Sequence, residues 1–232
     1  MPALTDQAIV LRLTAYSETS QVVSAFAARA GQLRLIAKGA RRSTATRFSA
    51  GLDLLEEIEL SYLPPRGDAQ LGTLTEWVQR EAFVGLRGEL SRLYAGLYAA
   101  ELVLELTEEG DPHPPLYRAL RQALGNLAGS AEVLRVLAEF QAALLTAIGY
   151  APNLTECVGC RRARAPRAPA MFSATAGGLL CRDCEMHHVE KRRLPPGLAD
   201  TTPATGDAAG WFELQDYYLR HLAGRSFKTV SY

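Results

Sequence analysis

Apolar and polar residues alternate along five short segments in the first third of the chain. These segments comprise residues 7–16, 21–28, 31–39, 54–63 and 70–77. A repeat of two residues places successive side chains on opposite faces of an extended backbone, so the five segments are predicted to be β-strands. Gly31 separates the second from the third, Gly39 ends the third, and the prolines of "LPPRGD" mark the connection between the last two.

Five strands within residues 1–80 predict a small closed β-barrel. The OB-fold is the commonest five-stranded barrel, and an SH3-like barrel is the alternative that strand spacing leaves open. One segment of this region, "DLLEEIEL", is interpreted as an edge strand whose acidic side chains are solvated.

After Trp77 the apolar repeat changes to three or four residues, which predicts helices. The predicted helices cover residues 91–110, 114–129, 131–150 and 211–224. Ser130 is the predicted N-cap of the third helix, whose apolar stripe is interpreted as facing the core. Residues 161–180 and 194–210 are rich in Pro, Ala and Gly and are predicted to be loops.

Composition predicts a folded cytosolic protein. Of the 232 residues, 48% are hydrophobic, which is enough to bury a core. The chain has no apolar run of about 18 residues and no basic-then-apolar start typical of a secretion signal, so no membrane partner is expected. The formal net charge is zero, but residues 81–150 carry five basic and nine acidic residues, whereas residues 151–232 carry eleven and eight. Local charge is therefore more informative than the sum.

Four cysteines form the strongest chemical pattern in the chain. Cys157-x2-Cys160 and Cys181-x2-Cys184 are separated by twenty residues, a spacing that lets two turns present four thiolates to one tetrahedral Zn2+ ion. Four cysteine ligands leave no open position for water, so the predicted zinc is structural and not catalytic.

Other residues near the cysteines are interpreted as structural or solvated. Gly159 and the pair Gly177 and Gly178 are expected to give the φ freedom that tight turns around a metal require. His188-Val189-Glu190 matches the H-x-E of zinc deaminases, but there it precedes the cysteine pair and here it follows. The match is therefore discounted.

A basic stretch with no acidic residue contains Arg34, Lys38, Arg41, Arg42 and Arg47. On a small barrel, a third strand that ends in a basic loop would place these side chains near one face, where they could neutralise DNA phosphates. The alternative is an ordinary solvated surface. A second cluster, Lys191, Arg192 and Arg193, could extend the same DNA-binding track or only increase solubility.

The residue pattern predicts a binding protein and not an enzyme. Paired carboxylates, a nucleophile elbow and a phosphate-binding glycine loop do not stand out in the sequence. The leading hypothesis is a DNA-binding protein. A zinc-ribbon scaffold that binds only other proteins, without direct DNA binding, is the alternative.

Several segments resemble the RecO family of bacterial recombination mediators. The segment "AIVLRLTAYSETSQVVSAFAARAGQLRLIAKGARR" is similar to the opening of that family in the type and order of its "YSE", "GQL" and "AKGARR" motifs. The segments "GYAPNLTECVGC" and "FSATAGGLLCRDC" are similar to the family's zinc segment, and "YLRHLAGRSFKT" to its C-terminal end. The similarity runs over essentially the whole chain.

The resemblance implies an α+β multidomain fold. Its expected parts are an N-terminal five-stranded OB-fold barrel at residues 1–80, an α-helical domain at 81–150 that is completed by 194–232, and a four-cysteine zinc module at 151–193. Of the proposed DNA-binding residues, Lys38, Arg41 and Arg42 carry over from the family's motif.

The resemblance also implies a function in the cytoplasm, in association with the nucleoid. Family members bind single- and double-stranded DNA, anneal complementary strands, and assist RecA loading together with RecR on DNA coated by single-strand-binding protein, whose acidic C-terminal tail they engage. Some members lack the cysteines, which implies that zinc is a scaffold and takes no part in annealing.

Overall fold

The computed structural model describes residues 2–39, 52–67 and 69–227. The chain forms two compact units, unit 1 within residues 1–130 and unit 2 within residues 131–228, and each is described by itself. The boundary falls between the second and third predicted helices. The division into barrel, helical domain and zinc module stays a prediction.

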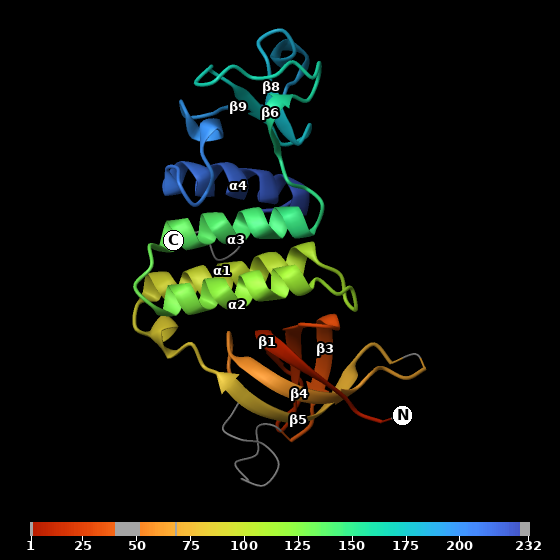
Figure 1. The fold of residues 1–232 in the computed structure, drawn as a ribbon. Coiled ribbons are helices and arrows are strands. Elements are labelled where there is room, and N and C mark those ends of the chain that lie inside the picture. Colours follow the sequence, from red (N-terminus) through yellow and green to blue (C-terminus); the bar gives the residue numbers. More distant parts are fainter. Residues whose placement is uncertain (1, 40–51, 68, 228–232) are drawn as a thin grey trace. The chain divides into compact units, whose positions relative to one another are not determined.

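Unit 1 contains a closed barrel of five strands, as predicted from the alternating pattern (Figure 1). The strands are β1 Leu4–Ala15, β2 Gln21–Ala27, β3 Gly31–Ala37, β4 Glu57–Leu63 and β5 Gly72–Glu81. Their order is β1-β2-β3-β5-β4, with β4 pairing with β1 and a short parallel contact between β3 and β5. Because β5 inserts between β3 and β4, the barrel has the Greek-key order of the OB-fold, and the predicted fold is confirmed.

The narrow interior of this barrel is filled by small and large side chains from all five strands. Alanines allow the strands to approach closely, while larger residues such as Leu60 and Trp77 fill the remaining volume. The buried core comprises Ala8, Val10, Val23, Ala25, Ala27, Leu35, Ala37, Leu52, Ile58, Leu60, Tyr62, Leu74 and Trp77. Since alternate residues of a strand face outward, polar residues such as Arg34 remain on the outer surface.

The edge-strand interpretation of "DLLEEIEL" was wrong, and two of its four acidic residues are buried, whereas Asp53 and Glu59 remain partly exposed. In the closed barrel β4 has a neighbour on each side, and Glu56 and Glu57 are only 6% and 4% exposed. The Tyr117 hydroxyl and Arg121 Nε donate hydrogen bonds of 2.8 Å to Glu57. Gln79 Nε2 donates to Glu56 at 2.6 Å. A buried carboxylate requires such donors, because desolvation otherwise penalises its charge.

Two helices complete unit 1 and confirm the first two predicted helices. They are α1, Leu90–Leu106, and α2, Pro114–Ala128. Pro114 suits the first turn of α2, where its missing N–H has no helical acceptor to lose. One face of α2 is buried, with residues at the spacing of a helical stripe: Leu116, Tyr117, Leu120, Ala123, Leu124 and Leu127.

The segment that follows α1 packs against the turn between β2 and β3. Gln32 Nε2 donates to the carbonyl of Leu104 at 3.3 Å, and the amide of Gly110 donates to the carbonyl of Gln32 at 3.0 Å. Gly31 has a φ of +70°, and a Cβ at this position would lie 2.1 Å from the carbonyl oxygen of Asp111. Gly31 therefore does more than separate two strands, because only glycine permits this approach.

Two further helices belong to unit 2, and they confirm the remaining predicted helices. They are α3, Val133–Ala147, and α4, Ala208–Ala223. The apolar stripe of α3 is buried at Val136, Leu137, Phe140 and Leu144, as predicted. The N-cap of α3 is Glu132 and not Ser130, so the predicted helix start was wrong.

Unit 2 also holds a small sheet in a region predicted to be largely loop. Its strands are β6 Asn153–Cys157, β7 Met171–Ser173, β8 Gly178–Leu180 and β9 Arg192–Arg193, in the order β6-β8-β7-β9. Strands of two or three residues are too short to show a repeat in the sequence, which is why the pattern missed β7 and β8. Among the described residues, none of the helices combines the length and the apolar character that crossing a membrane requires.

Tyr117→Phe is expected to lower the free energy of unfolding of unit 1 by about 1–2 kcal/mol, because it removes a buried donor to the Glu57 carboxylate. Burial and the bond to Glu57 also raise the pKa of Tyr117, so its hydroxyl stays a donor at all ordinary pH values. Urea unfolding measures the change. Tyr16→Phe is the matched control, because Tyr16 is 63% exposed. Equal stability of both variants would contradict the role of this bond.

Candidate metal centre and nucleic-acid interface

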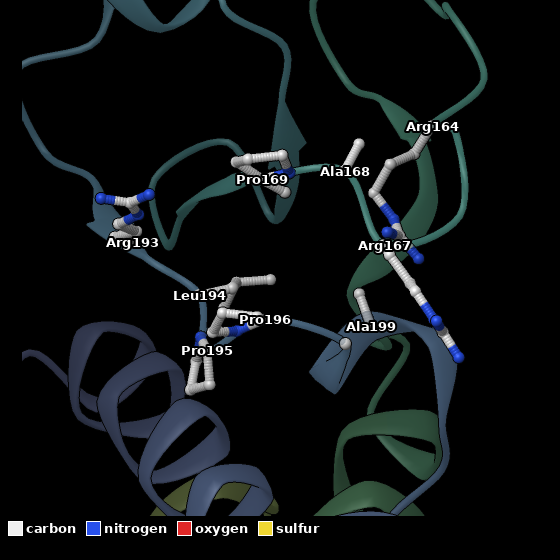
Figure 2. A pocket seen from close by; sticks show the side chains of 11 residues that line it. Arg164, Arg167, Ala168, Pro169, Arg193, Leu194, Pro195, Pro196 and Ala199 are labelled. Carbon is white, nitrogen blue, oxygen red and sulfur yellow. The ribbon is translucent and has the colours of Figure 1, made fainter.

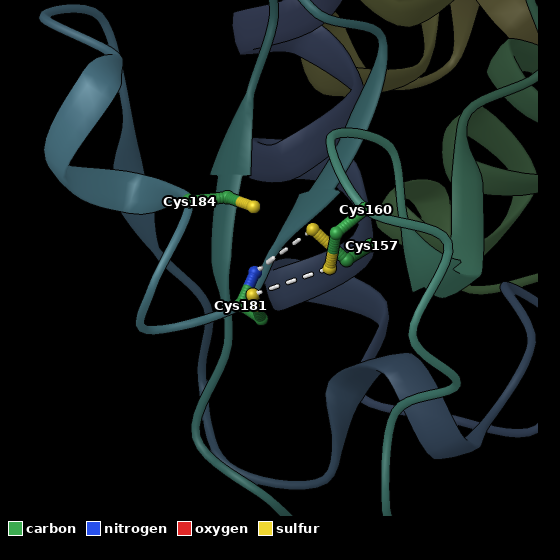
Figure 3. Close-up of side chains that lie close together, drawn as sticks. All are labelled: Cys157, Cys160, Cys181 and Cys184. Atoms are coloured by element: carbon green, nitrogen blue, oxygen red, sulfur yellow. Dashed lines mark hydrogen bonds between the residues drawn. The ribbon is translucent and has the colours of Figure 1, made fainter.

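The four cysteines meet because two short strands run parallel. β6 pairs with β8 in parallel register, with Cys157 opposite Leu179. Each strand leads directly into one Cys-x2-Cys turn, since Cys157 is the last residue of β6 and Cys181 follows the last residue of β8. The carboxyl ends of parallel neighbours lie at the same edge of a sheet, so the two turns face each other (Figure 3).

The four sulfur atoms lie within 4.8 Å of one another, which confirms the predicted cluster. The Sγ atoms of Cys160 and Cys181 are 3.7 Å apart. Cys157 is buried and Cys160 is exposed, while the other two cysteines are half-buried. Four sulfur donors at one point match a tetrahedral metal site, and neither His187 nor His188 belongs to the cluster that the described residues form.

The thiols of the cluster differ in acidity. Burial raises the pKa of Cys157, but hydrogen bonds from the amides of Cys181, Cys160 and Gly159 outweigh it and lower the pKa to about 6. The Cys181 amide lies 3.3 Å from Cys157 Sγ (Figure 3). Hydrogen bonds with Cys181 and Cys157 raise the pKa of Cys184 to about 12. Four negative sulfurs at this distance repel one another, so full deprotonation requires a cation among them.

The glycines near the cluster have two different functions. Gly177 has a φ of +71°, so the prediction of backbone freedom holds there. Gly159 and Gly178 do not have a positive φ, and the prediction is wrong for these two residues. A Cβ at Gly178 would lie 2.5 Å from Val158 Cγ1, so close packing explains this glycine. A Cβ at Gly159 would lie 3.0 Å from Cys184 Sγ, so glycine is needed because the second turn comes so close.

Glu190 connects the sheet of the metal module to α4. Its carboxylate accepts hydrogen bonds from the Ser173 hydroxyl and from the amides of Ala174 and Thr175, at 2.9–3.1 Å, and from the Tyr217 hydroxyl. Burial raises the pKa of Glu190, but these donors outweigh it and lower the pKa to about 2. Glu190 therefore has a structural role, which agrees with the decision to discount the H-x-E match.

Two residues of the predicted DNA-binding stretch lie on the described part of the barrel. Arg34 is exposed on β3 and forms an ion pair of 3.4 Å with Glu109, whose side chain is also about half exposed. Lys38 is exposed directly after β3. An exposed ion pair is weak and screened by salt, so Arg34 can exchange Glu109 for a phosphate at little cost. Arg41, Arg42 and Arg47 lie outside the described residues.

The second predicted basic cluster is mostly engaged within unit 2. Lys191 Nζ donates to the carbonyls of Glu185 and His188 at 2.6 and 2.8 Å. The Arg192 guanidinium lies 5.2 Å from the ring centre of Tyr217 and is also bound to Glu213. Arg193 is exposed. The DNA-binding role of all three residues stays a prediction.

A further set of arginines in unit 2 was missed in the sequence analysis. Arg161, Arg162, Arg164 and Arg167 occur in the seven residues "RRARAPR" without an acidic residue. This run could have been found by the same criterion that selected the stretch from Arg34 to Arg47. The Pro- and Ala-rich composition of residues 161–180 predicts a loop but says nothing about which of its arginines are exposed.

The chain was compared with known protein families. Residues 1–83 match the family model of the recombination protein O N terminal, and residues 87–228 match that of the recombination protein O C terminal.

Curated relatives agree with these matches. A DNA repair protein RecO from Rhodopirellula baltica is 37% identical over 178 residues, which cover 76% of this chain and 65% of the relative. The same protein from Anaeromyxobacter dehalogenans is 33% identical over 209 residues, which cover 90% and 77%. A third, from Syntrophobacter fumaroxidans, is 32% identical over 197 residues, which cover 83% and 74%. The matched part is thus shorter than each relative.

Glu190→Gln is expected to lower the free energy of unfolding of unit 2 by about 2–3 kcal/mol at neutral pH, because several donors lose a charged acceptor. The pKa of Glu190 is lowered in the folded state, so its contribution is present above about pH 4.5 and is lost as the pH falls toward about 2. Urea unfolding of wild type and variant over this range measures the difference in unfolding free energy. This difference should become smaller as the pH falls from about 4.5 toward about 2. Glu139→Gln, on the exposed side of α3, is the control. A pH-independent difference would refute the role of the charge.

Proposed function

This chain belongs to the RecO family of DNA repair proteins, and we propose that it acts as a recombination mediator that binds single- and double-stranded DNA and anneals complementary strands. It would work in the cytoplasm at the nucleoid, without catalysing a covalent step. The observation that carries the proposal is the match of both family models, one to the OB-fold barrel and one to the helices and the cysteine cluster.

The proposed DNA-binding residues of unit 1 are Arg34 and Lys38, which are exposed on the barrel, together with Arg41, Arg42 and Arg47, which lie outside the described residues. Support comes from the exposure of Arg34 within β3 and of Lys38 directly after it, since OB-folds commonly use this strand for oligonucleotides. Contacts to phosphates position a strand but do not read its sequence. Bases held in this way stay free to pair, which is what annealing requires.

We further propose that the four cysteines bind one Zn2+ ion with a structural role. Zinc–thiolate bonds of about 2.3 Å in a tetrahedron place sulfur atoms about 3.8 Å apart. The distance of 3.7 Å between the Sγ atoms of Cys160 and Cys181 fits this value. Bound zinc would compensate the charge of the thiolates and hold the two turns together. All four ligand positions are filled by protein, which leaves no site for a reactive water.

The proposed partners are RecR, the C-terminal tail of single-strand-binding protein and, indirectly, RecA. They follow from family membership alone. No residue of this chain is assigned to these contacts.

Lys38→Glu is expected to weaken binding of a fluorescent single-stranded oligonucleotide, and the triple variant Lys38→Glu, Arg41→Glu, Arg42→Glu is expected to weaken it further. Each lost phosphate contact should reduce the slope of log affinity against log salt by about 0.7. Titrations at several salt concentrations measure both quantities. Arg118→Glu, on an exposed position of α2, makes the same charge change as Lys38→Glu and is the control. Unchanged affinity of the triple variant would remove this surface from the proposal.

The alternative function is a scaffold that binds only other proteins. A wild-type chain that retains no DNA at low salt but binds its protein partners would favour this alternative.

The purified chain is expected to contain one zinc ion, and Cys157→Ser is expected to lower zinc content, solubility and melting temperature. Gly159→Ala keeps all four thiols but should weaken zinc retention against a chelator, because its Cβ would crowd Cys184 Sγ. Gly125→Ala is the control, since its Cβ would meet its nearest neighbour at 3.8 Å. Wild-type melting of Cys157→Ser would contradict the structural role of the metal.

A further inference from the structure

Three adjoining hollows surround Pro169 and Ala170 in unit 2. Their volumes are about 40, 510 and 230 Å3, and both residues line all three. Five arginines line one or more of the hollows: Arg162, Arg164, Arg167, Arg182 and Arg193. Glu185 is the only acidic residue among their lining residues. We call this surface the arginine groove.

Three of these arginines are available to a ligand. Arg167, Arg182 and Arg193 are exposed, and within the described part of the chain none of their guanidinium groups forms a hydrogen bond or an ion pair. The backbone amide of Arg167 donates to the Asp200 carboxylate at 3.0 Å, and the charges of these two residues attract each other. Arg193 lies across the prolines from Arg167 in the smallest hollow (Figure 2). Positive charge therefore lies on both sides of one concave surface, and the Asp200 carboxylate offsets only part of it, on the side of Arg167.

The other two arginines are partly neutralised. Arg162 pairs with Asp183, and both side chains are about two-thirds exposed, so this ion pair is weak. Arg164 is mostly buried and pairs with Asp200, but its Nε has no hydrogen-bond partner among the described residues. Arg164 thus adds to the positive field of the groove while its position is fixed.

The backbone of the groove also favours a role for Arg167. Its φ is +58°, in the left-handed region that glycine adopts without strain. An arginine in this conformation keeps a strained backbone although a glycine would relieve it. The strain is explained if the guanidinium at this position is used.

We propose that the arginine groove is a second nucleic-acid contact, which binds the phosphate backbone of single- or double-stranded DNA through charge and hydrogen bonds. This inference rests on the proposed function and adds a surface in unit 2 to the one in unit 1. Guanidinium groups match phosphate oxygens with two parallel hydrogen bonds. The lining residues include no aromatic side chain, so base stacking does not contribute, and the groove does not distinguish sequences or strand number. A contact in each unit lets one molecule hold two strands.

The test uses the full chain with the triple variant Arg167→Glu, Arg182→Glu, Arg193→Glu and its milder counterpart with glutamine at the same positions. Fluorescent single-stranded and duplex oligonucleotides are titrated at several salt concentrations. Three lost phosphate contacts should reduce the salt slope by about 2 for single strands and somewhat more for duplex, with about tenfold or greater loss of affinity at low salt. Melting temperature and zinc content show that the variants are folded. The single variants Arg167→Glu, Arg182→Glu and Arg193→Glu are titrated as well, and each is compared with Arg118→Glu, which makes an equal charge change on unit 1.

The outcomes separate this inference from the proposed function. Loss of affinity for both DNA forms in the groove variants, but not in Arg118→Glu, supports the groove. Wild-type affinity and salt slope in the groove variants, with binding lost in Lys38→Glu, would overturn the groove and leave the proposed function intact. If wild type binds no DNA, both fail. A polyglutamate peptide is titrated in parallel, and loss of peptide binding alone in the groove variants would identify the groove as a site for acidic peptides and overturn the proposal.

Discussion

Four sulfur atoms confined within 4.8 Å of one another are the constraint on which the fold of unit 2 depends. The sheet around them has strands of two to five residues, too short to be stable by pairing alone. The cluster joins the ends of β6 and β8, and Glu190 joins the turn after β7 to Tyr217 of α4. The strands of this module are stabilised by electrostatic contacts: the Glu190 carboxylate accepts hydrogen bonds from several donors, and the proposed zinc would hold the thiolates in the same way.

Unit 1 uses buried polar contacts for a related purpose. Its barrel has an apolar interior, but the attachment of the helices relies on Glu57 with Tyr117 and Arg121, and on Gln32 with the end of α1. Hydrogen bonds in a desolvated setting have strict geometry, so they hold the helices in one position on the barrel. The attachment uses the strand ends and the β2–β3 turn, and it leaves Arg34 and Lys38 on an exposed surface.

The two units show why net charge is a poor guide to function in this chain. The formal charge is zero, yet three exposed arginines of unit 2, Arg167, Arg182 and Arg193, line one groove. Two neighbouring arginines in the sequence have different surroundings. Arg192 lies over the Tyr217 ring, whereas Arg193 lines a hollow. A protein that holds DNA only through such local surfaces can release it again when salt or a competing partner changes the balance.

The sequence by itself determined the barrel strands, the four α-helices and the four-cysteine cluster. Five strands, four helices and the four-cysteine spacing depend on residues close together in the chain, where a period of two or about 3.6 or a short turn is directly readable. Only the tertiary structure decided which charges are free and which are buried. Glu57 is buried by partners 60 and 64 residues away, and Lys191 and Arg192 are engaged by carbonyls and an aromatic ring. The three-residue strand β7 forms only because distant segments pair with it. Glycine is needed at position 159 only because Cys184 lies close to it in space. Neither contact can be predicted from a local sequence pattern.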